Sequence, residues 1–368
     1  MYGLTMDLPI FEFQVRKDNF AETRIVEAAT LPLGDGQARL RIDLFAMTSN
    51  NITYAAMGEG ELGYWDFFPA KQGWGRPPCW GFATVEASNS EHVAIGARVY
   101  GYFPIGTHLD VTPSRATPNG FFDGAEHRKS KSAVYNQYLL TSADPAYDSG
   151  REAEQSLFRP LYATGWWAAD FINHTTPLPG TVILTSASAK TALATAHQLK
   201  SLGGARLIGL TSARNLEYVQ GTGLYDQSAT YDTAVDITLE GTVVYVDFLG
   251  REEVTAGLHR ALGPALQRSV MIGATDWAAK PGGILVPKAK LDGPQPEFFF
   301  VPGYAAQRIK EEGVALRAKM TADLSAFYAI SNQFVEPTRL SGSAAVETSW
   351  HRLLEGRVPP SEGLVLTS

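Results

Sequence analysis

The sequence is short of cysteine, of long hydrophobic runs and of positive charge, and each shortage excludes a class of protein. Cys79 is the single cysteine among 368 residues, which excludes an intramolecular disulfide and a multi-cysteine zinc site. No apolar run approaches the ~18 residues that span a membrane. The net charge is −7, whereas nucleic-acid binders and binders of anionic membranes need a basic face. We therefore expect neither nucleic acid nor a membrane as a partner.

The composition is that of a globular chain. Hydrophobic residues make up 45% and charged residues 19%, which excludes the disordered class. At roughly 100–200 residues per domain, the length predicts two domains, or three. The N-terminal stretch MYGLTMDLPIFEF has no basic segment followed by an apolar one, so the sequence predicts no secretory signal and a cytoplasmic protein.

Two patterns of secondary structure divide the chain. Residues 10–140 contain short strand-like pieces, among them Ala38–Phe45, Phe82–Glu86 and Val99–Phe103, which predict a partly open β-barrel. Residues 180–275 alternate short apolar strands with helices. Strand–helix–strand units at this spacing predict right-handed crossovers and a parallel sheet.

The first strand-to-helix turn of the second region carries the chemistry. A strand over Thr181–Thr185 leads into a helix over Ala189–Leu202, and the N–H groups and dipole of a helix N-terminus favour an anion. The turn SASAKTA is not the G-x-G-x-x-G fingerprint, but its small residues still let the backbone approach a ligand. The candidate phosphate-binding residues are Ser186, Ser188, Ala189, Lys190 and Thr191. A plain turn without a ligand is the alternative.

The end of the next strand indicates which dinucleotide would bind. A carboxylate there would hold the ribose 2′-hydroxyl of NAD(H), but the chain has Thr211, Ser212 and Arg214 instead. Hydroxyl groups and a guanidinium suit a 2′-phosphate, so the sequence favours NADP(H) over NAD(H). The alternative is that Arg214 is a solvated residue at the start of a helix.

These segments resemble a known superfamily. LTSASAKTALATAHQLKSLGGARLIGLTSARN resembles the nucleotide-binding crossover of the medium-chain dehydrogenase/reductases. Their quinone-oxidoreductase-like members carry a G-A-S-G-G-V-G turn, in which the present chain replaces four glycines by Ser186, Ala189, Lys190 and Ala192. GDGQARLRIDLFAMTSN, IGARVYGYF and the final AVETSWHRLLEGRVPPSEGLVLTS are similar to other parts of that superfamily. More narrowly, SNNITYAAMGEGELGYWDFFPA, WGF, YGYFP, LTSARN and GATDW resemble the uncharacterised family DUF2855.

The resemblance implies an α/β fold of two domains. Residues 1–150, completed by about 325–368, would form a GroES-like, partly open β-barrel domain. Residues 151–324 would form a Rossmann-type domain with a doubly wound parallel sheet that binds NADP(H). The superfamily also implies a homodimer. Where zinc-dependent members carry G-H-E, this chain has Trp80-Gly81-Phe82, and Cys79 has no histidine at a spacing typical of a zinc ligand, so we expect no metal.

The resemblance also places candidate catalytic residues. In zinc-free members the stretch after the second barrel strand lines the active cleft, which makes Tyr54 the first candidate proton donor and Asn51 a polarising amide. Tyr135, in the segment VYNQY, is the second candidate donor. For each tyrosine the alternative is core packing with a satisfied hydroxyl.

Two more loops are expected at the cofactor, because ligands bind at the carboxyl ends of parallel strands. Asp247 and Phe248 end one strand, and Gly273, Ala274 and Thr275 follow another; their backbone groups would hold the carboxamide. The favoured hypothesis is a zinc-independent, NADPH-dependent reductase of a carbonyl or activated C=C bond in a small, apolar or aromatic substrate. The alternatives are an NADP(H) sensor that has lost catalysis, and a lyase or isomerase that uses the cofactor without net redox change.

Overall fold

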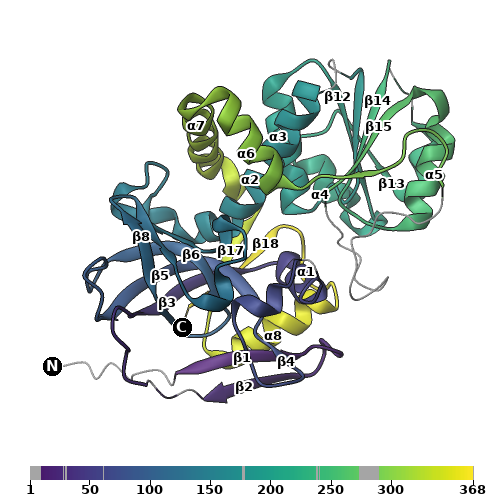
Figure 1. Cartoon of the computed structure of the whole chain (residues 1–368). Coiled ribbons are helices and arrows are strands. Elements are labelled where there is room, and N and C mark those ends of the chain that lie inside the picture. The colour runs from purple at the N-terminus through teal and green to yellow at the C-terminus, as the bar shows by residue number, and fades with distance from the viewer. Residues whose placement is uncertain are drawn as a thin grey trace. The chain divides into compact units, whose positions relative to one another are not determined.

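The computed structural model describes residues 10–27, 29, 31–60, 62–175, 179–237, 239, 241–272 and 290–367. The chain forms two compact units (Figure 1). Unit 1 comprises Met1–Leu157 and Glu336–Ser368, and unit 2 comprises Phe158–Val335. The sequence placed these divisions near residues 150 and 324. The first division falls within one continuous helix, α2 (Glu152–Thr175).

The described residues of unit 1 form two sheets, the α-helices α1 and α8 and the first turns of α2. One sheet has the strand order β2-β1-β4, and the other has the order β17-β18-β3-β5-β6-β10-β9-β8, with β7 paired to β3. Its elements are β1 (Phe11–Arg16), β2 (Thr23–Glu27), β3 (Ala38–Met47), α1 (Ser49–Ala56), β4 (Trp74–Gly75), β5 (Pro78–Ser88), β6 (Arg98–Pro104), β7 (His108–Val111), β8 (Pro113–Thr117), β9 (Gly120–Asp123), β10 (Gln137–Leu140), β17 (Glu336–Ser341), α8 (Ser343–Leu354) and β18 (Glu362–Thr367).

The long pairing of β3 with β5 depends on a glycine. Gly81 lies opposite Phe45, and a Cβ atom at position 81 would lie 2.1 Å from the carbonyl oxygen of Leu44. Only a residue without a side chain lets the two backbones come this close. Elsewhere α8 packs on β1, where the rings of Trp350 and Phe13 lie 5.5 Å apart.

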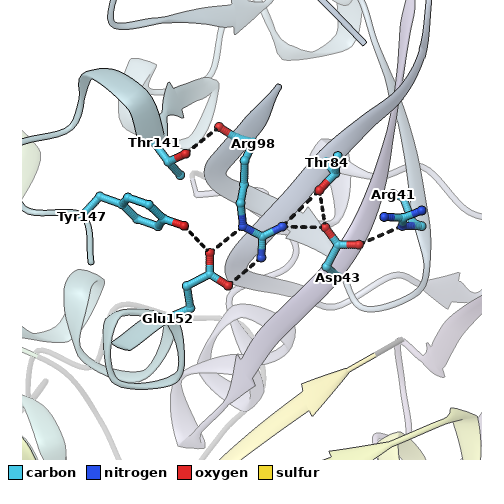
Figure 2. A network of polar contacts seen from close by, with 7 residues as sticks. All are labelled: Arg41, Asp43, Thr84, Arg98, Thr141, Tyr147 and Glu152. Carbon is cyan, nitrogen blue, oxygen red and sulfur yellow. Dashed lines mark hydrogen bonds and ion pairs between the residues drawn. The ribbon is translucent and has the colours of Figure 1, made fainter. Parts of the chain in front are cut away.

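A polar network ties the strands of unit 1 to the first turn of α2 (Figure 2). The Arg98 guanidinium donates to Asp43 Oδ2 at 2.8 Å and to Glu152 Oε2 at 2.6 Å. Thr84 donates to the same Asp43 oxygen at 2.6 Å, and Tyr147 donates to Glu152 at 2.8 Å. The arginine therefore joins β3, β5 and β6 to α2 through charge-assisted hydrogen bonds, which are about twice as strong as neutral ones.

Unit 2 is a six-stranded parallel sheet with helices on both faces. The strand order is β13-β12-β11-β14-β15-β16, and α3 and α5 lie on opposite faces of the sheet (Figure 1). Its elements are the rest of α2, β11 (Thr181–Leu184), α3 (Lys190–Leu202), β12 (Arg206–Thr211), α4 (Leu216–Gly221), β13 (Gln227–Thr230), β14 (Val243–Asp247), α5 (Glu252–Leu262), β15 (Leu266–Met271), β16 (Glu297–Phe298), α6 (Val301–Glu312) and α7 (Val314–Ile330).

The sheet order reverses at β11. The chain runs outward from β11 through β12 to β13, then returns to the other side of β11 with β14 and β15. In such doubly wound sheets ligands bind outside the carboxyl ends of the strands at this switch point. All four residues of β11 are buried, as expected for a strand covered on both faces. Within the described ranges, no helix is long and apolar enough to cross a membrane.

Candidate functional site

The turn after β11 keeps a glycine-like backbone although its glycines are replaced. Ser186 has a φ of +46°, in the left-handed region that costs a side-chain-bearing residue about 1–2 kcal/mol. Its carbonyl accepts a hydrogen bond from Ala189 N at 2.7 Å, and Ala187 N donates to Leu210 O at 3.0 Å. The serine therefore adopts the conformation for which the related turns use glycine.

Helix α3 begins directly after this turn and presents its N-terminus. Its first residue is Lys190, and the preceding Ala189 makes no side-chain capping hydrogen bond. The first four N–H groups of a helix have no partner inside the helix, and alanine cannot satisfy them. Such N–H groups, together with the helix dipole, bind a phosphate. The residues present thus fit a dinucleotide pyrophosphate.

Two tyrosines from a later part of the chain form hydrogen bonds with the backbone of the turn. Ser186 N donates to the hydroxyl of Tyr231 at 3.2 Å. The Tyr225 hydroxyl donates to Ala187 O at 2.9 Å. Sequence reasoning missed both residues, because their hydrogen bonds join positions 45 and 38 residues apart in the chain.

The carboxyl end of β12 carries the residues predicted for a 2′-phosphate. Ser212 is half-buried and Arg214 is exposed, in a short 3-10 helix over Ala213–Asn215. Asn215 Nδ2 donates to Ser188 Oγ at 3.1 Å, which joins this loop to the turn after β11. Thr211 is only 1% exposed. Its buried hydroxyl does not reach the surface where the sequence predicted a ligand contact.

The side chain of Asp247, at the end of β14, is buried among donors of its own unit. Asp247 is 3% exposed, and its carboxylate accepts hydrogen bonds from Thr185 Oγ1 at 2.7 Å and Leu249 N at 2.9 Å. Its own carbonyl accepts from Ile272 N, and Phe248 N donates to Thr185 Oγ1. These hydrogen bonds brace the sheet edge and occupy the Asp247 carbonyl and the Phe248 N–H, so a carboxamide contact at Asp247 and Phe248 stays a prediction. Gly273, Ala274 and Thr275 lie outside the described residues.

Unit 1 gathers the candidate catalytic tyrosines into one aromatic cluster. Its buried members are Tyr54, Tyr64, Phe67, Phe68 and Tyr102, with Tyr135 and Trp80 packed against them. The rings of Tyr54 and Tyr64 lie 4.7 Å apart, and those of Tyr102 and Tyr135 lie 4.9 Å apart. The structure therefore brings the two predicted donors, Tyr54 and Tyr135, into one cluster.

Three hydroxyl groups of this cluster have hydrogen-bond partners inside it, whereas the buried Tyr102 hydroxyl has none among the described residues. The hydroxyls of Tyr64 and Tyr135 lie 3.0 Å apart, and the Tyr54 hydroxyl accepts from Trp80 Nε1 at 2.9 Å. Burial, reinforced by neighbouring tyrosines, raises the pKa of Tyr54, Tyr64 and Tyr135 above the usual value of a phenol. All three therefore stay protonated at neutral pH. Tyr64 was not among the candidate residues predicted from the sequence.

Asn51 has a local structural role. It is 3% exposed, its Oδ1 accepts from Thr48 N at 2.6 Å, and its Nδ2 donates to Pro78 O at 2.7 Å. With Thr48 it forms the capping box that starts α1. Its amide is thus committed to the helix start and to β5, and not free to polarise a substrate.

A cavity of about 300 Å³ in unit 1 is lined by three arginines, each with its own acidic partner. The pairs are Arg39 with Asp110 at 2.7 Å, Arg76 with Glu12 at 3.2 Å and Arg128 with Asp123 at 2.9 Å. Because the arginines that line the cavity are neutralised by these acidic partners, we assign the cavity no catalytic role.

The described part of the chain offers no metal centre. It contains no group of three or more His, Cys, Asp and Glu side chains that could hold a metal ion, whereas a catalytic zinc needs three protein ligands. Cys79 is fully buried, and burial raises the pKa of its thiol. The thiolate that would bind a metal is therefore disfavoured.

The sheets of the two units and the turn after β11 define a class of fold, the GroES-like barrel joined to a Rossmann-type sheet that medium-chain dehydrogenase/reductases share. CurA from Vibrio vulnificus, solved in complex with NADPH, matches with a TM-score of 0.61 at 12% identity over 97% of this chain and 99% of that one. A putative NADPH:quinone reductase from Bacillus thuringiensis matches with a TM-score of 0.56 at 15% identity over 98% and 100%. The yhdH oxidoreductase from Salmonella enterica, in complex with NADP, matches with a TM-score of 0.54 at 14% identity over 98% of this chain and 99% of that one.

The chain itself belongs to the family described as "Protein of unknown function (DUF2855)", whose pattern matches residues 45–359. No curated protein matches it in sequence. The fold and family predicted from the sequence are confirmed.

Proposed function

We propose that this protein binds NADP(H) and is a zinc-independent oxidoreductase that reduces a carbonyl or activated C=C bond of a small, apolar or aromatic substrate. The observation that carries the proposal is the turn after β11, where Ser186 keeps a left-handed backbone and α3 starts without a side-chain cap. The structural similarity to proteins solved with NADPH and NADP supports it.

In this proposal the pyrophosphate lies on the N-terminus of α3. The N–H groups of its first turn and the hydroxyls of Ser188 and Thr191 donate to phosphate oxygens, and Lys190 adds a positive charge. Ser212 and Arg214 hold the 2′-phosphate from the end of β12. The arginine suits this role because it is exposed and has no acidic partner among the described residues.

The tyrosine cluster supplies the proton. When bound, the nicotinamide provides the hydride that completes a two-electron reduction. We propose that Tyr135 donates a proton to the oxygen or carbon that becomes basic in the reduced substrate. Tyr64, 3.0 Å away, then hydrogen-bonds the resulting phenolate, and solvent returns the proton. Tyr54 is the second candidate donor, but its hydroxyl is already an acceptor from Trp80.

The cofactor preference tests the first part of the proposal. We expect the wild-type protein to bind NADPH more tightly than NADH, and Arg214→Ala to weaken NADPH binding by about tenfold, because a charge-assisted hydrogen bond is worth about 1.5–3 kcal/mol. Affinity for NADH should not change. Fluorescence titration measures both, with Arg260→Ala, another exposed arginine of unit 2, as the matched control. An unchanged NADPH/NADH ratio in Arg214→Ala would remove the arginine from the site.

Consumption of NADPH across a panel of enones, quinones and aldehydes tests the chemistry. For an accepted substrate we expect Tyr135→Phe to lower kcat by about 100-fold, as loss of a general acid does, while the Kd of NADPH stays the same. Because burial raises the tyrosine pKa, the acid form persists to above pH 10, and the proton-donating step should not slow between pH 6 and 9. Full activity in both Tyr135→Phe and Tyr54→Phe would reject a tyrosine donor.

One observation favours a second candidate, an NADP(H) sensor without catalysis. The hydroxyls of Tyr54, Tyr64 and Tyr135 all pack into an aromatic cluster with protein partners, which is also how core tyrosines behave. NADPH binding without turnover of any substrate in the panel would support the sensor over the reductase.

A further inference from the structure

We propose that Tyr225 and Tyr231 are positioning residues that hold the cofactor turn in place of its missing glycines. The inference rests on the proposed function, because it explains how a turn with serine and lysine at glycine positions keeps the shape that a pyrophosphate needs. Here "tyrosine clamp" means these two side chains and their hydrogen bonds to Ser186 and Ala187.

The clamp reaches the turn from the far edge of the sheet. Tyr225 precedes β13 and Tyr231 follows it, whereas the turn follows β11, with β12 lying between these two strands. One tyrosine binds the N–H side of the turn, where the hydroxyl of Tyr231 accepts from Ser186 N at 3.2 Å. The other binds the carbonyl side, where Tyr225 donates to Ala187 O at 2.9 Å.

The middle strand makes room for the clamp. A Cβ atom on Gly209 in β12 would lie 2.8 Å from the Tyr225 ring and 3.0 Å from Ala187 Cβ. Any side chain at position 209 would therefore displace the tyrosine, the turn or both. The glycine that this nucleotide site requires lies in the strand beneath the ring, where its φ is not positive, and not at the turn itself.

The energetic reason for the clamp lies at Ser186. The residue is 7% exposed and has a positive φ, so its backbone is strained and its N–H is shielded from water. A buried N–H without a partner is unfavourable, and the turn would relax toward a negative φ if the Tyr231 hydroxyl were removed. A glycine at position 186 adopts the same φ without strain, so it should not need the clamp.

This reasoning gives a rescue experiment. We expect Tyr231→Phe and Tyr225→Phe each to raise the Kd of NADPH by about five- to tenfold, the equivalent of one lost hydrogen bond. Because a glycine relieves the strain at position 186, Ser186→Gly in the Tyr231→Phe background should restore most of the lost affinity. A merely structural role for Tyr231 predicts no rescue, because the glycine adds no contact.

A matched control and a cofactor-free measurement complete the test. Tyr304→Phe removes a tyrosine hydrogen bond of 2.8 Å to Asp170 elsewhere in unit 2 and should leave the Kd unchanged. Amide hydrogen exchange of Ser186, measured without NADPH, should accelerate in Tyr231→Phe. Unchanged exchange there, or a Kd that Ser186→Gly does not rescue, would overturn the clamp. A wild-type protein that binds no NADPH while Ser186 exchange still depends on Tyr231 would instead overturn the proposed function alone.

Discussion

Arg128→Ala is expected to lower the free energy of unfolding of unit 1 by about 3–5 kcal/mol, the usual cost of breaking a buried ion pair from one side. Arg128 is 1% exposed. Its guanidinium donates to Asp123 Oδ2 at 2.9 Å, Asn136 Oδ1 at 2.9 Å and Tyr135 O at 2.6 Å. Truncation leaves the Asp123 carboxylate, itself 5% exposed, without its cation.

The same substitution should also affect the proposed proton donor. Arg128 binds the backbone of Tyr135 and the hydroxyl of Tyr138, so its loss frees the segment that places the Tyr135 ring. We expect turnover to fall along with stability. Chemical denaturation followed by circular dichroism measures the stability change, with Lys129→Ala as control, because the Lys129 ion pair with Glu126 is exposed and such pairs contribute at most about 1 kcal/mol. A change in Arg128→Ala no larger than that of the control would contradict the expectation.

The fold followed from local sequence signals. Alternation in ARLRIDLF predicted a strand that the structure extends to Met47 as β3. The small and apolar residues spaced along Ala189–Leu202 predicted α3, which ends at Gly203 with a φ of +72°. Each of these signals lies within a short stretch of sequence, so the periodicity of its apolar residues is enough to predict the strand or helix. The similarity of whole segments to a known superfamily then supplied the domain types.

The site followed only in part, because its decisive contacts are long-range. The small residues and uncapped helix start at Ser186 and Lys190 could be read locally. The hydroxyl of Tyr231 could not, since nothing near position 231 indicates that it meets a turn 45 residues earlier. Tyr64 likewise meets Tyr135 across 71 residues. Side-chain contacts between residues this far apart depend on the order of the strands in the sheet. A single sequence does not show which side chains that order brings together.

The side chain of Asp247 shows a second limit of sequence reasoning, because the prediction considered only the backbone groups of this residue and gave its carboxylate no role. A side chain at the carboxyl end of a parallel strand can point toward a bound cofactor or back into the sheet. Sequence position does not distinguish these directions. In the structure the Asp247 side chain points back, and it accepts hydrogen bonds from Thr185 directly after β11, from Leu249 in its own loop and from Thr255 in α5.

Asp247→Ala is therefore expected to destabilise unit 2 by about 3–5 kcal/mol, since each buried donor left unsatisfied costs about 1–3 kcal/mol. Asp247 Oδ1 accepts from Thr185 Oγ1 at 2.7 Å and Leu249 N at 2.9 Å, and Oδ2 accepts from Thr255 Oγ1 at 3.1 Å. Thr185 directly precedes Ser186, so its displacement should also weaken NADPH binding. Urea denaturation and fluorescence titration of the same variant measure the two effects.

Asp247→Asn separates the hydrogen bonds from the charge. The asparagine keeps one acceptor oxygen for Thr185 and Leu249 but presents an NH₂ group to Thr255, so we expect about half the loss seen with alanine. Asp232→Ala, at an exposed acid of the same unit, should change stability by no more than about 0.5 kcal/mol. If Asp247→Ala unfolds at the same urea concentration as Asp232→Ala and wild type, while its NADPH affinity falls, then the carboxylate does not brace the sheet edge.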